Sequence, residues 1–348
     1  MLVKLFKISL TFTLILLGFV ISLSYRTVYK PISHSKSNDY ITIQKGSSIQ
    51  EISTTLVNEG IIKNDYAFLL YIKFRGLGPK LKAGDYRFPS PISPLEVISR
   101  LQEGQQKSFR FTVIEGWTRW DIANALLRIP EFSNRNISQI LTLMNDTTKI
   151  HGIDSQAENL EGFLYPDTYY FPLNSSLETV INSLTDKSIS IWNTETLTRA
   201  KILNQTPRQI LTIASMIETE AKLAEERPII ASVIYNRLAK KMPLGIDSTI
   251  IYASKLIGKW KYDGKIYRSD LDLKSPYNTR INVGLPPGPI ASPSASSVKA
   301  ALNPSQTDYL FYVRNPERID GTHNFYNNDL DFQKGVTALR NWEKQQLR

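Results

Sequence analysis

The strongest constraint on the fold lies in the middle of the chain, where residues 209–247 read QILTIASMIETEAKLAEERPIIASVIYNRLAKKMPLGID. The preceding TPRQ at 206–209 forms a capping box with proline at the first helical position, so it predicts the start of a helix. Apolar residues then recur at helical spacing and give that helix one apolar face. These residues are Ile210, Ile213, Ala214, Ile217 and Ala221. A second helix is predicted over residues 229–239.

One glutamate, Glu218, lies at the edge of that apolar face. Its neighbours one helical turn away are Ala214, Ser215, Ala221 and Lys222. Three of the four are small, which leaves space beside the carboxylate. Apolar and small surroundings raise the pKa of a carboxyl group and suit a general acid. Glu220 lies about 200° further round the helix, so it is expected to point elsewhere and to tolerate substitution. The alternative for Glu218 is an ordinary solvated glutamate.

Composition narrows the possible functions. The 348 residues suffice for two or three domains, and the absence of cysteine excludes disulfides, thiolate metal sites and a cysteine nucleophile. Only three histidines are present, which argues against a multi-histidine metal site, and we expect neither a metal nor a cofactor. The net charge of +10 favours an anionic partner such as a lipid surface or an acidic polymer. A solvated basic surface explains that charge equally well.

The N-terminus predicts a membrane anchor. Residues 8–23 carry no charge and follow Lys4 and Lys7, and the run to residue 25 is long enough to span a tilted bilayer. The lysines favour a cytoplasmic start, so we expect a tail at 1–7, a transmembrane helix at 8–25 and a linker at 26–39. A signal peptide cleaved after residues 22–24 is the alternative. Either reading exports the body of the protein, which argues against nucleic acid as a partner.

A pattern near the N-terminus recurs seventy residues later: TIQKGSSIQEI at 42–52 reads like TVIEGWTRWDI at 112–122. Each copy predicts a strand, a glycine turn and a capped helix. The first copy continues with a helix near residues 65–74, in which Tyr66, Leu69, Leu70 and Lys73 recur at helical spacing, and then a short strand within 82–88. The pattern resembles the start of a LysM module, a small βααβ fold that binds N-acetylglucosamine polymers. The alternative is that the chain uses the same strand–turn–helix unit twice and that this unit binds no ligand.

The remaining segments suggest places for binding. Residues 130–154 are predicted to be helical and polar, with a loop at 145–148, and 160–171 then read LEGFLYPDTYYF. Aromatic rings interleaved with carboxylates suit sugars, whose apolar faces stack on rings while their hydroxyls need acceptors. Core packing explains such rings equally well. Residues 275–280 and 282–290 hold too much proline and glycine for helix or strand interiors, and ordered loops of this kind often carry binding groups.

Six segments together, in this order along the chain, resemble the YceG-like family of endolytic murein transglycosylases. They are EGFLYPDTY (161–169), ASMIETEA (214–221), ERPIIASVIYNRL (226–238), LGIDSTIIYA (244–253), SPYNTR (275–280) and GLPPGPIASPSASSVKAAL (284–302). The resemblance extends from the N-terminal segment to about residue 330. This chain departs from the family at Ser248, where relatives commonly have proline, and at residues 322–325, which differ from the usual glycine-rich His-x-Phe.

The resemblance implies an α+β protein with an N-terminal transmembrane helix, a LysM-like βααβ subdomain at 40–105 and a mixed α+β catalytic domain at 106–348. It implies a single-pass inner-membrane protein with its catalytic domain in the periplasm. The implied reaction cleaves the β-1,4 bond between N-acetylmuramic acid and N-acetylglucosamine in nascent glycan strands. It leaves 1,6-anhydromuramic ends and terminates strand elongation. The implied partners are glycan strands and the inner membrane, with peptidoglycan synthases as candidates.

In the family the catalytic residue is the first acidic residue of the ASxxE segment, which is Glu218 here. Ordinary glycosidases need two carboxylates. A lytic enzyme can use one, which protonates the departing glycosidic oxygen and then takes the proton of the muramic 6-hydroxyl as that hydroxyl attacks the anomeric carbon. Motif membership and side-chain chemistry nominate five residues to hold the sugars: Glu161, Asp247, Tyr252, Tyr277 and Asn278. The alternatives are a muramidase with Asp247 or Glu161 as second carboxylate, and a non-catalytic peptidoglycan-binding anchor.

The uncharged run behind Lys4 and Lys7 leads to a first prediction. We expect the N-terminal segment to remain uncleaved, because its length suits a membrane span better than its flank suits a signal peptidase. N-terminal sequencing of the membrane-extracted protein should therefore begin at or next to Met1. A sequence that began near Tyr25 would contradict the anchor.

Overall fold

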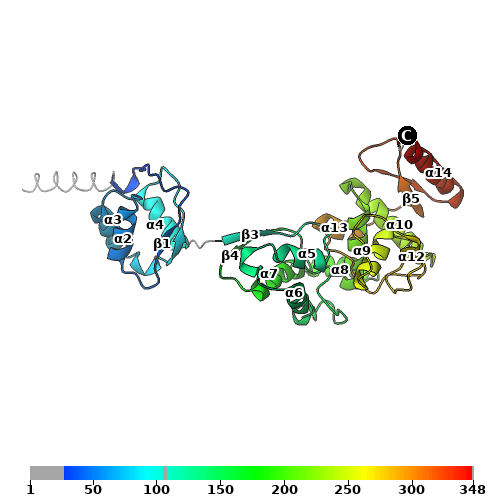
Figure 1. The fold of residues 1–348 in the computed structure, drawn as a ribbon, viewed down its shortest axis with the longest axis horizontal. Helices are drawn as coiled ribbons and strands as arrows, with labels where there is room; N and C mark the ends of the chain where they lie inside the picture. The colour runs from blue at the N-terminus through cyan, green and yellow to red at the C-terminus, as the bar shows by residue number, and fades with distance from the viewer. Residues whose placement is uncertain (1–26, 105–107, 347–348) are drawn as a thin grey trace, which may run out of the picture. The chain divides into compact units, whose positions relative to one another are not determined.

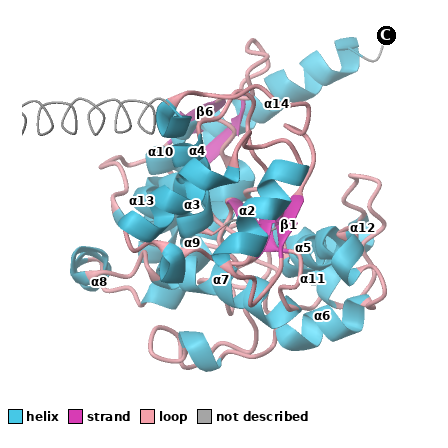
Figure 2. Ribbon diagram, turned by 90° about the vertical axis from the view of Figure 1, so that its left-hand side faces the viewer, coloured by secondary structure: helices cyan, strands magenta, loops and turns pink. Residues whose placement is uncertain are grey.

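The computed structural model describes residues 27–104 and 108–346, which form two compact units, Met1–Phe109 and Arg110–Arg348 (Figure 1). Both are mixed α+β: helices dominate, and the short named strands pair two by two (Figure 2). In the described part of the chain, no helix has the length and apolarity needed to span a membrane. The span expected at residues 8–25 lies outside the described residues.

The first unit has the element order β-α-α-β-α. Its two strands pair antiparallel, with Ile41 opposite Tyr86 and Ile43 opposite Gly84. Two helices lie between these strands in sequence, and a third follows them. The elements are β1 (Ile41–Ile43), α2 (Ile49–Asn58), α3 (Asp65–Phe74), β2 (Gly84–Tyr86) and α4 (Pro94–Glu103). The observed order of the first four is therefore βααβ.

Local sequence sets the ends of these helices. Ser48 and Glu51 form a capping box at the start of α2, and Ser93 and Glu96 form another at α4, where Pro94 takes the first helical position. An N-cap of this kind contributes about 1 kcal/mol to helix stability. Gly104 ends α4 with a φ of 79°, a value that glycine adopts without strain.

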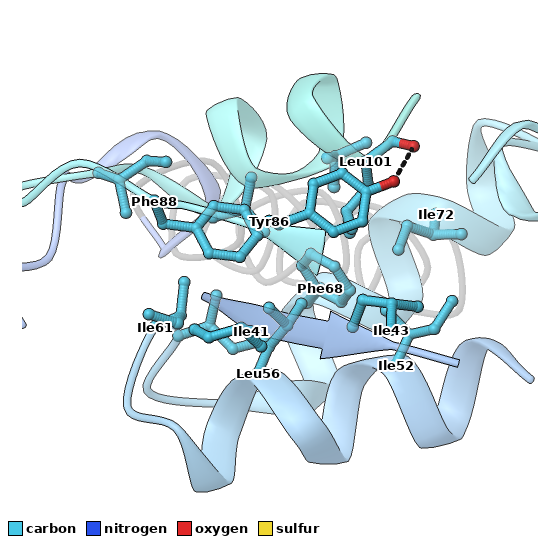
Figure 3. Packing of buried hydrophobic residues seen from close by; sticks show 14 residues of the cluster. Ile41, Ile43, Ile52, Leu56, Ile61, Phe68, Ile72, Tyr86, Phe88 and Leu101 are labelled. Atoms are coloured by element: carbon cyan, nitrogen blue, oxygen red, sulfur yellow. Dashed lines mark hydrogen bonds between the residues drawn. The ribbon is translucent and has the colours of Figure 1, made fainter. Parts of the chain in front are cut away.

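A single apolar cluster fills the first unit (Figure 3). Buried side chains from β1, α2 and α3 meet Tyr86 and Phe88, whose rings stack 5.9 Å apart. The Tyr86 hydroxyl donates hydrogen bonds to the carbonyls of Lys82, at 2.5 Å, and Leu101, at 3.3 Å. The only buried polar atom of this large ring is thereby satisfied, as burial requires.

The buried face of α3 is not the face whose residues recur at helical spacing in the sequence analysis. Phe68 and Ile72 are the buried residues of α3, whereas Tyr66 is 72% exposed and Leu70 is 46% exposed. The sequence DYAFLLYIKF is apolar almost all round the helix, so periodicity could not select the buried face.

The second unit begins with a similar order of elements. Its first elements are β3 (Ser108–Thr112), α5 (Arg119–Leu126), α6 (Ile137–Leu143), β4 (Thr168–Pro172) and α7 (Leu177–Ile189). The segment expected to be helical over residues 130–154, with a loop at 145–148, contains less α-helix than expected. Only α6 is α-helical there, flanked by 3₁₀ turns at Pro130–Phe132 and Thr148–Ile150. Asn136 caps α6 afresh, and Asp146 accepts hydrogen bonds from Thr148, so polar side chains break the segment into separate pieces.

The rest of the second unit is built around α9, which contacts α8, α10, α11 and α13. All eight residues from Ile210 to Ile217 are buried, so α9 is the central helix of this region. The capping box of Thr206 and Gln209 predicted for it is present, with Pro207 at the first position. The helices are α8 (Thr194–Ile202), α9 (Pro207–Glu220), α10 (Arg227–Ala239), α11 (Asp247–Leu256), α12 (Arg268–Leu271) and α13 (Ala295–Leu302).

A hairpin and a long helix complete the second unit. β5 (Phe311–Arg314) pairs antiparallel with β6 (His323–Tyr326), with Phe311 opposite Tyr326. α14 (Asp329–Gln346) packs on both strands, and Phe332 stacks on Phe311 with ring centroids 4.9 Å apart. These late elements therefore form a small α+β layer of their own within the unit.

The packing of the first unit predicts the outcome of two leucine substitutions. Leu56→Ala should destabilise α2 by about 2–5 kcal/mol, because Leu56 is fully buried and the surrounding core closes only partly around the cavity. Leu70→Ala, on the exposed side of α3, should cost at most about 0.5 kcal/mol. Hydrogen exchange of the α2 and α3 amides in the intact protein measures both effects. Equal losses for the two variants would show that the core has been misassigned.

Candidate active site

Glu218 lies in the last turn of α9, with its side chain 5% exposed. Its Oε1 accepts a hydrogen bond from Nη2 of Arg227 at 3.0 Å. Its Oε2 accepts two more from Ser294, one from the backbone N–H at 2.7 Å and one from the hydroxyl at 2.5 Å. Both carboxylate oxygens are therefore held by donors from outside α9.

The two partners of Glu218 occupy the starts of other helices. Arg227 is the first residue of α10, followed by proline at the second position, and Ser294 is the N-cap of α13. An N-cap serine has a free-standing backbone N–H and a hydroxyl on one side, so it can offer two donors to one oxygen. The packing of α9 against α10 and α13 thus brings these donors to the carboxylate.

These contacts correct the surroundings predicted for Glu218. The small neighbours on α9 are present, and Ala214 and Ala221 are buried. The space that they leave is occupied by an ion pair and a serine, so the carboxylate does not sit in an apolar environment. Spacing within one helix cannot reveal partners that other segments supply. Arg227 and Ser294 both lie in motifs that carried the family resemblance, and their positions at helix starts were the available signal.

A turn of the preceding chain also reaches Glu218. Gly116 has a φ of +77°, and a Cβ atom added there would lie 4.0 Å from Cγ of Glu218. The N–H of Gly116 donates to the carbonyl of Ser292 at 2.9 Å, and the N–H of Ser292 donates to the carbonyl of Trp117 at 2.8 Å. This pair of backbone hydrogen bonds joins the 115–118 turn to the segment that ends in Ser294.

Glu161 lies in the segment between α6 and β4, and its carboxylate contacts the first residue of α5, Arg119. It is 4% exposed, and its two carboxylate oxygens accept the N–H of Arg119 at 3.2 and 3.3 Å. Burial raises the pKa of Glu161 to about 7, although the hydrogen bond from Arg119 and its charge act in the opposite direction. Glu161 also hydrogen-bonds the side chain of Tyr252. With this pKa, the carboxyl group of Glu161 changes its protonation state close to neutral pH.

Tyr252 and Tyr277 form an aromatic layer beside Glu161. Their ring centroids lie 4.8 Å apart, and Trp120 packs against Tyr252 at 5.4 Å. Tyr252 is buried, whereas Tyr277 is partly exposed and, with Glu161, lines a cavity of about 390 Å³. Burial raises the pKa of Tyr277 to about 12, so its hydroxyl stays protonated at neutral pH and is available as a donor.

Asp247 and Asn278 have different surroundings. Asp247, at the start of α11, is half exposed and accepts hydrogen bonds from Nε and Nη2 of Arg280, at 3.0 and 2.6 Å. Asn278 is completely buried, and its amide donates to the carbonyls of Leu271 and Leu273, each at 2.9 Å. These hydrogen bonds hold Asn278 to the backbone of its own loop.

Glu220 has its own hydrogen-bond partners and is not an ordinary solvated glutamate. It accepts hydrogen bonds from the hydroxyl of Tyr312 at 3.0 Å and from that of Ser248 at 3.3 Å. Burial raises the pKa of Glu220 above its ordinary value. Ser248 is the position at which the family commonly has proline, and a proline there would have no hydroxyl to offer Glu220. Glu220 thus joins α9 to α11 and β5.

A second buried pair ties the hairpin to the start of α10. Glu226, which precedes Arg227, accepts hydrogen bonds from the backbone N–H of His323 at 2.7 Å, and its other oxygen lies 2.8 Å from Nδ1 of the same histidine. The His323 ring meets Tyr312 edge-on, with centroids 5.3 Å apart. Within residues 27–104 and 108–346, no group of three or more His, Asp or Glu side chains is placed to hold a metal ion.

The raised pKa of Glu161 predicts how stability changes with pH. The protonated form stabilises the folded state, and this contribution is present at low pH and lost as pH rises from the ordinary pKa of 4.5 through about 7. Glu161→Gln cannot ionise and should gain about 2–3 kcal/mol relative to the wild type between pH 5 and pH 8.

Urea unfolding followed by tryptophan fluorescence measures this difference, because all five tryptophans belong to the second unit. Glu195→Gln, an exposed position on α8, is the matched control and should follow the wild type at both pH values. A constant difference between Glu161→Gln and the wild type across this range would contradict the assignment.

Comparison with known proteins agrees with the family read from the sequence. The YceG-like family model matches residues 41–338. An endolytic murein transglycosylase of Bacillus subtilis is 35% identical over 308 residues, which cover 83% of this chain and 82% of the relative. One from Streptococcus pneumoniae is 31% identical over 330 residues, which cover 87% of this chain but only 59% of that longer protein.

A solved structure is similar as well. The crystal structure of a YceG-like protein from Listeria monocytogenes superposes with a TM-score of 0.58 at 31% sequence identity, covering 86% of this chain and 99% of that one. The family model, the two relatives and this structure each cover both units of the chain. The chain therefore belongs to the YceG-like family.

Proposed function

We propose that this protein is an endolytic murein transglycosylase. It cleaves the β-1,4 bond between N-acetylmuramic acid and N-acetylglucosamine in nascent glycan strands, leaves 1,6-anhydromuramic ends and so terminates strand elongation. The observation that carries the proposal is Glu218, whose two carboxylate oxygens are fixed by Arg227 and Ser294. Relatives in Bacillus subtilis and Streptococcus pneumoniae that bear this name support the reaction class.

The mechanism uses Glu218 for both proton transfers. As general acid, it gives its proton to the glycosidic oxygen while the bond from the anomeric carbon to that oxygen breaks. As general base, it then takes the proton of the muramic 6-hydroxyl, whose oxygen forms the new bond to the anomeric carbon. Arg227 balances the negative charge that Glu218 carries between the two steps, and Ser294 keeps the carboxyl group in position.

The surrounding residues take three different roles in this proposal. Tyr277 and Asp247 are partly exposed and offer a hydroxyl donor and a carboxylate acceptor to the sugars. Glu161 and Tyr252 are buried, and they support the aromatic layer on which Tyr277 rests. Asn278 fixes the loop that carries Tyr277.

A muramidase is the second candidate, because Glu161 is a further carboxyl group with a perturbed pKa beside the same turn. A hydrolase needs that second carboxylate to contact water or the anomeric carbon. Glu161 is 4% exposed, and its oxygens already accept the N–H of Arg119. This enclosure argues against Glu161 as the second carboxylate, and Asp247, the other candidate, already accepts two hydrogen bonds from Arg280.

The same proposal includes location and the role of the first unit. Residues 8–25 anchor the protein in the inner membrane by their length and lack of charge, and the catalytic unit lies in the periplasm. The first unit is a LysM-like subdomain that contacts glycan strands, which its βααβ order supports. Peptidoglycan synthases are candidate partners, since they make the strands that this enzyme would cut.

Glu218→Gln tests the proposal. Glutamine preserves the shape, and its one carbonyl oxygen can accept from either Arg227 or Ser294, but it has no carboxyl proton to transfer. Turnover should fall about 10²–10⁴-fold, towards the upper end because one residue serves both steps. Mass spectrometry of sacculi treated with the wild type should show anhydromuramic ends, whereas reducing ends would identify a hydrolase.

Controls for this experiment follow from the structure. Glu220→Gln is unsuitable as a neutral control, since Glu220 is bonded to Tyr312 and Ser248. Glu195→Gln, exposed on α8, should retain wild-type activity. If Glu218→Gln, with a wild-type circular dichroism spectrum, still cleaves at near wild-type rate, Glu218 is not the catalytic acid.

A further inference from the structure

The βααβ order occurs twice in this chain. In the first unit, α2 and α3 contact each other between the paired strands β1 and β2. In the second, α5 and α6 contact each other between the paired strands β3 and β4. A serine-capped helix follows each copy, α4 after Ser93 and α7 after Ser176. The similarity between residues 42–52 and 112–122 is thus the visible part of a longer structural repeat.

The first corner of each copy, between its opening strand and helix, is built in the same way. Gly46 and Gly116 both have positive φ, +90° and +77°. A capping box begins the helix that follows, from Ser48 in one copy and Thr118 in the other. Both corners are therefore a left-handed glycine turn leading into a capped helix, and they can be compared position by position.

The two corners differ in what lies against them. A Cβ atom added at Gly46 would meet no other described atom within 4 Å, whereas one added at Gly116 would lie 4.0 Å from Glu218. The corner of the second copy is also pinned by the two backbone hydrogen bonds that Gly116 and Trp117 exchange with Ser292. One corner is thus open, and the other is docked beside the catalytic glutamate.

Trp117 is the next residue of this corner. It follows Gly116, it is partly exposed, and it stands where the first copy has Ser47. Within the described residues, its indole takes part in no stacking or cation–π contact. Trp120, by contrast, packs on Tyr252 and carries the Arg119 guanidinium over its ring. The backbone of Trp117 is fixed by the hydrogen bond with Ser292, and its side chain is partly exposed.

The second copy also contributes a carboxyl group to a cavity. Glu161 lies in the segment between α6 and β4, so it belongs to the copy that spans residues 108–172. It lines the cavity of about 390 Å³ together with Tyr277. One repeat unit therefore contributes the corner of Gly116 and Trp117 beside Glu218 and, separately, a buried carboxyl group to this cavity.

We propose that residues 108–172 form a glycan-holding arm of the active site, in which Trp117 is the platform for the sugar ring next to the cleaved bond. The apolar face of a pyranose ring stacks on an indole, and the adjacent Glu218 then meets the glycosidic oxygen. The inference rests on the function proposed above and identifies a residue that positions the substrate. The first copy, with Ser47 at this place, lacks that platform.

The test measures binding and turnover separately. Glycan chains of alternating N-acetylmuramic acid and N-acetylglucosamine, prepared from murein, are titrated calorimetrically into full-length Glu218→Gln with and without Trp117→Ala. We expect Trp117→Ala to weaken binding about tenfold and Trp117→Phe to restore most of it. In the otherwise wild-type protein, Trp117→Ala should raise KM more than it lowers kcat. Ile202→Ala, an exposed apolar residue on α8 and outside the arm, should change neither value.

The outcomes separate the two proposals. If Trp117→Ala binds and cleaves like its parent, the arm is wrong while the transglycosylase function stands. If the wild type yields no anhydromuramic ends but its glycan binding depends on Trp117, the arm stands and the function is wrong. A loss of binding in Trp117→Phe as large as in Trp117→Ala, with unchanged circular dichroism spectra, would also overturn stacking on the ring.

Discussion

The buried ion pair between Glu218 and Arg227 is the interaction on which the rest of the second unit depends. Both side chains are almost fully enclosed, 5% and 11% exposed. Removing one partner of such a pair leaves an unpaired buried charge and costs about 3–5 kcal/mol. The pair fixes the end of α9 against the start of α10, and Ser294 adds α13 to the same point. Stability and chemistry therefore share one set of contacts.

Local features of the fold could be predicted from the sequence because they depend on residues a few positions apart. The capping box at Thr206 sets where α9 begins, and it was evident from four residues. The recurrence of a strand, a glycine turn and a capped helix was visible for the same reason. Glu218 itself was found from the resemblance to a family, since helical spacing alone could not separate it from a solvated glutamate.

The features that the sequence did not predict depend on distant segments. Ser294 is 76 residues from Glu218, and no local pattern connects them. The buried face of α3 was ambiguous because apolar residues surround that helix. The βααβ repeat in the second unit was only half visible, since its second helix and strand have no sequence pattern in common with the first copy. Tertiary packing determines all three features, and packing cannot be read from a few consecutive residues.

The pairing of Glu226 with His323 has a consequence for how the site is assembled during synthesis. The chain emerges from its N-terminus, so α9 and α10 are made about a hundred residues before β6, at the 97-residue separation of this pair. Until then, the carboxylate next to Arg227 has no partner, and Glu220 lacks Tyr312. In a chain that lacks β5 and β6, Glu220 and Glu226 therefore lack these hydrogen-bond donors. β5 and β6, which follow α10 along the chain, thus complete the surroundings of Glu220 and Glu226.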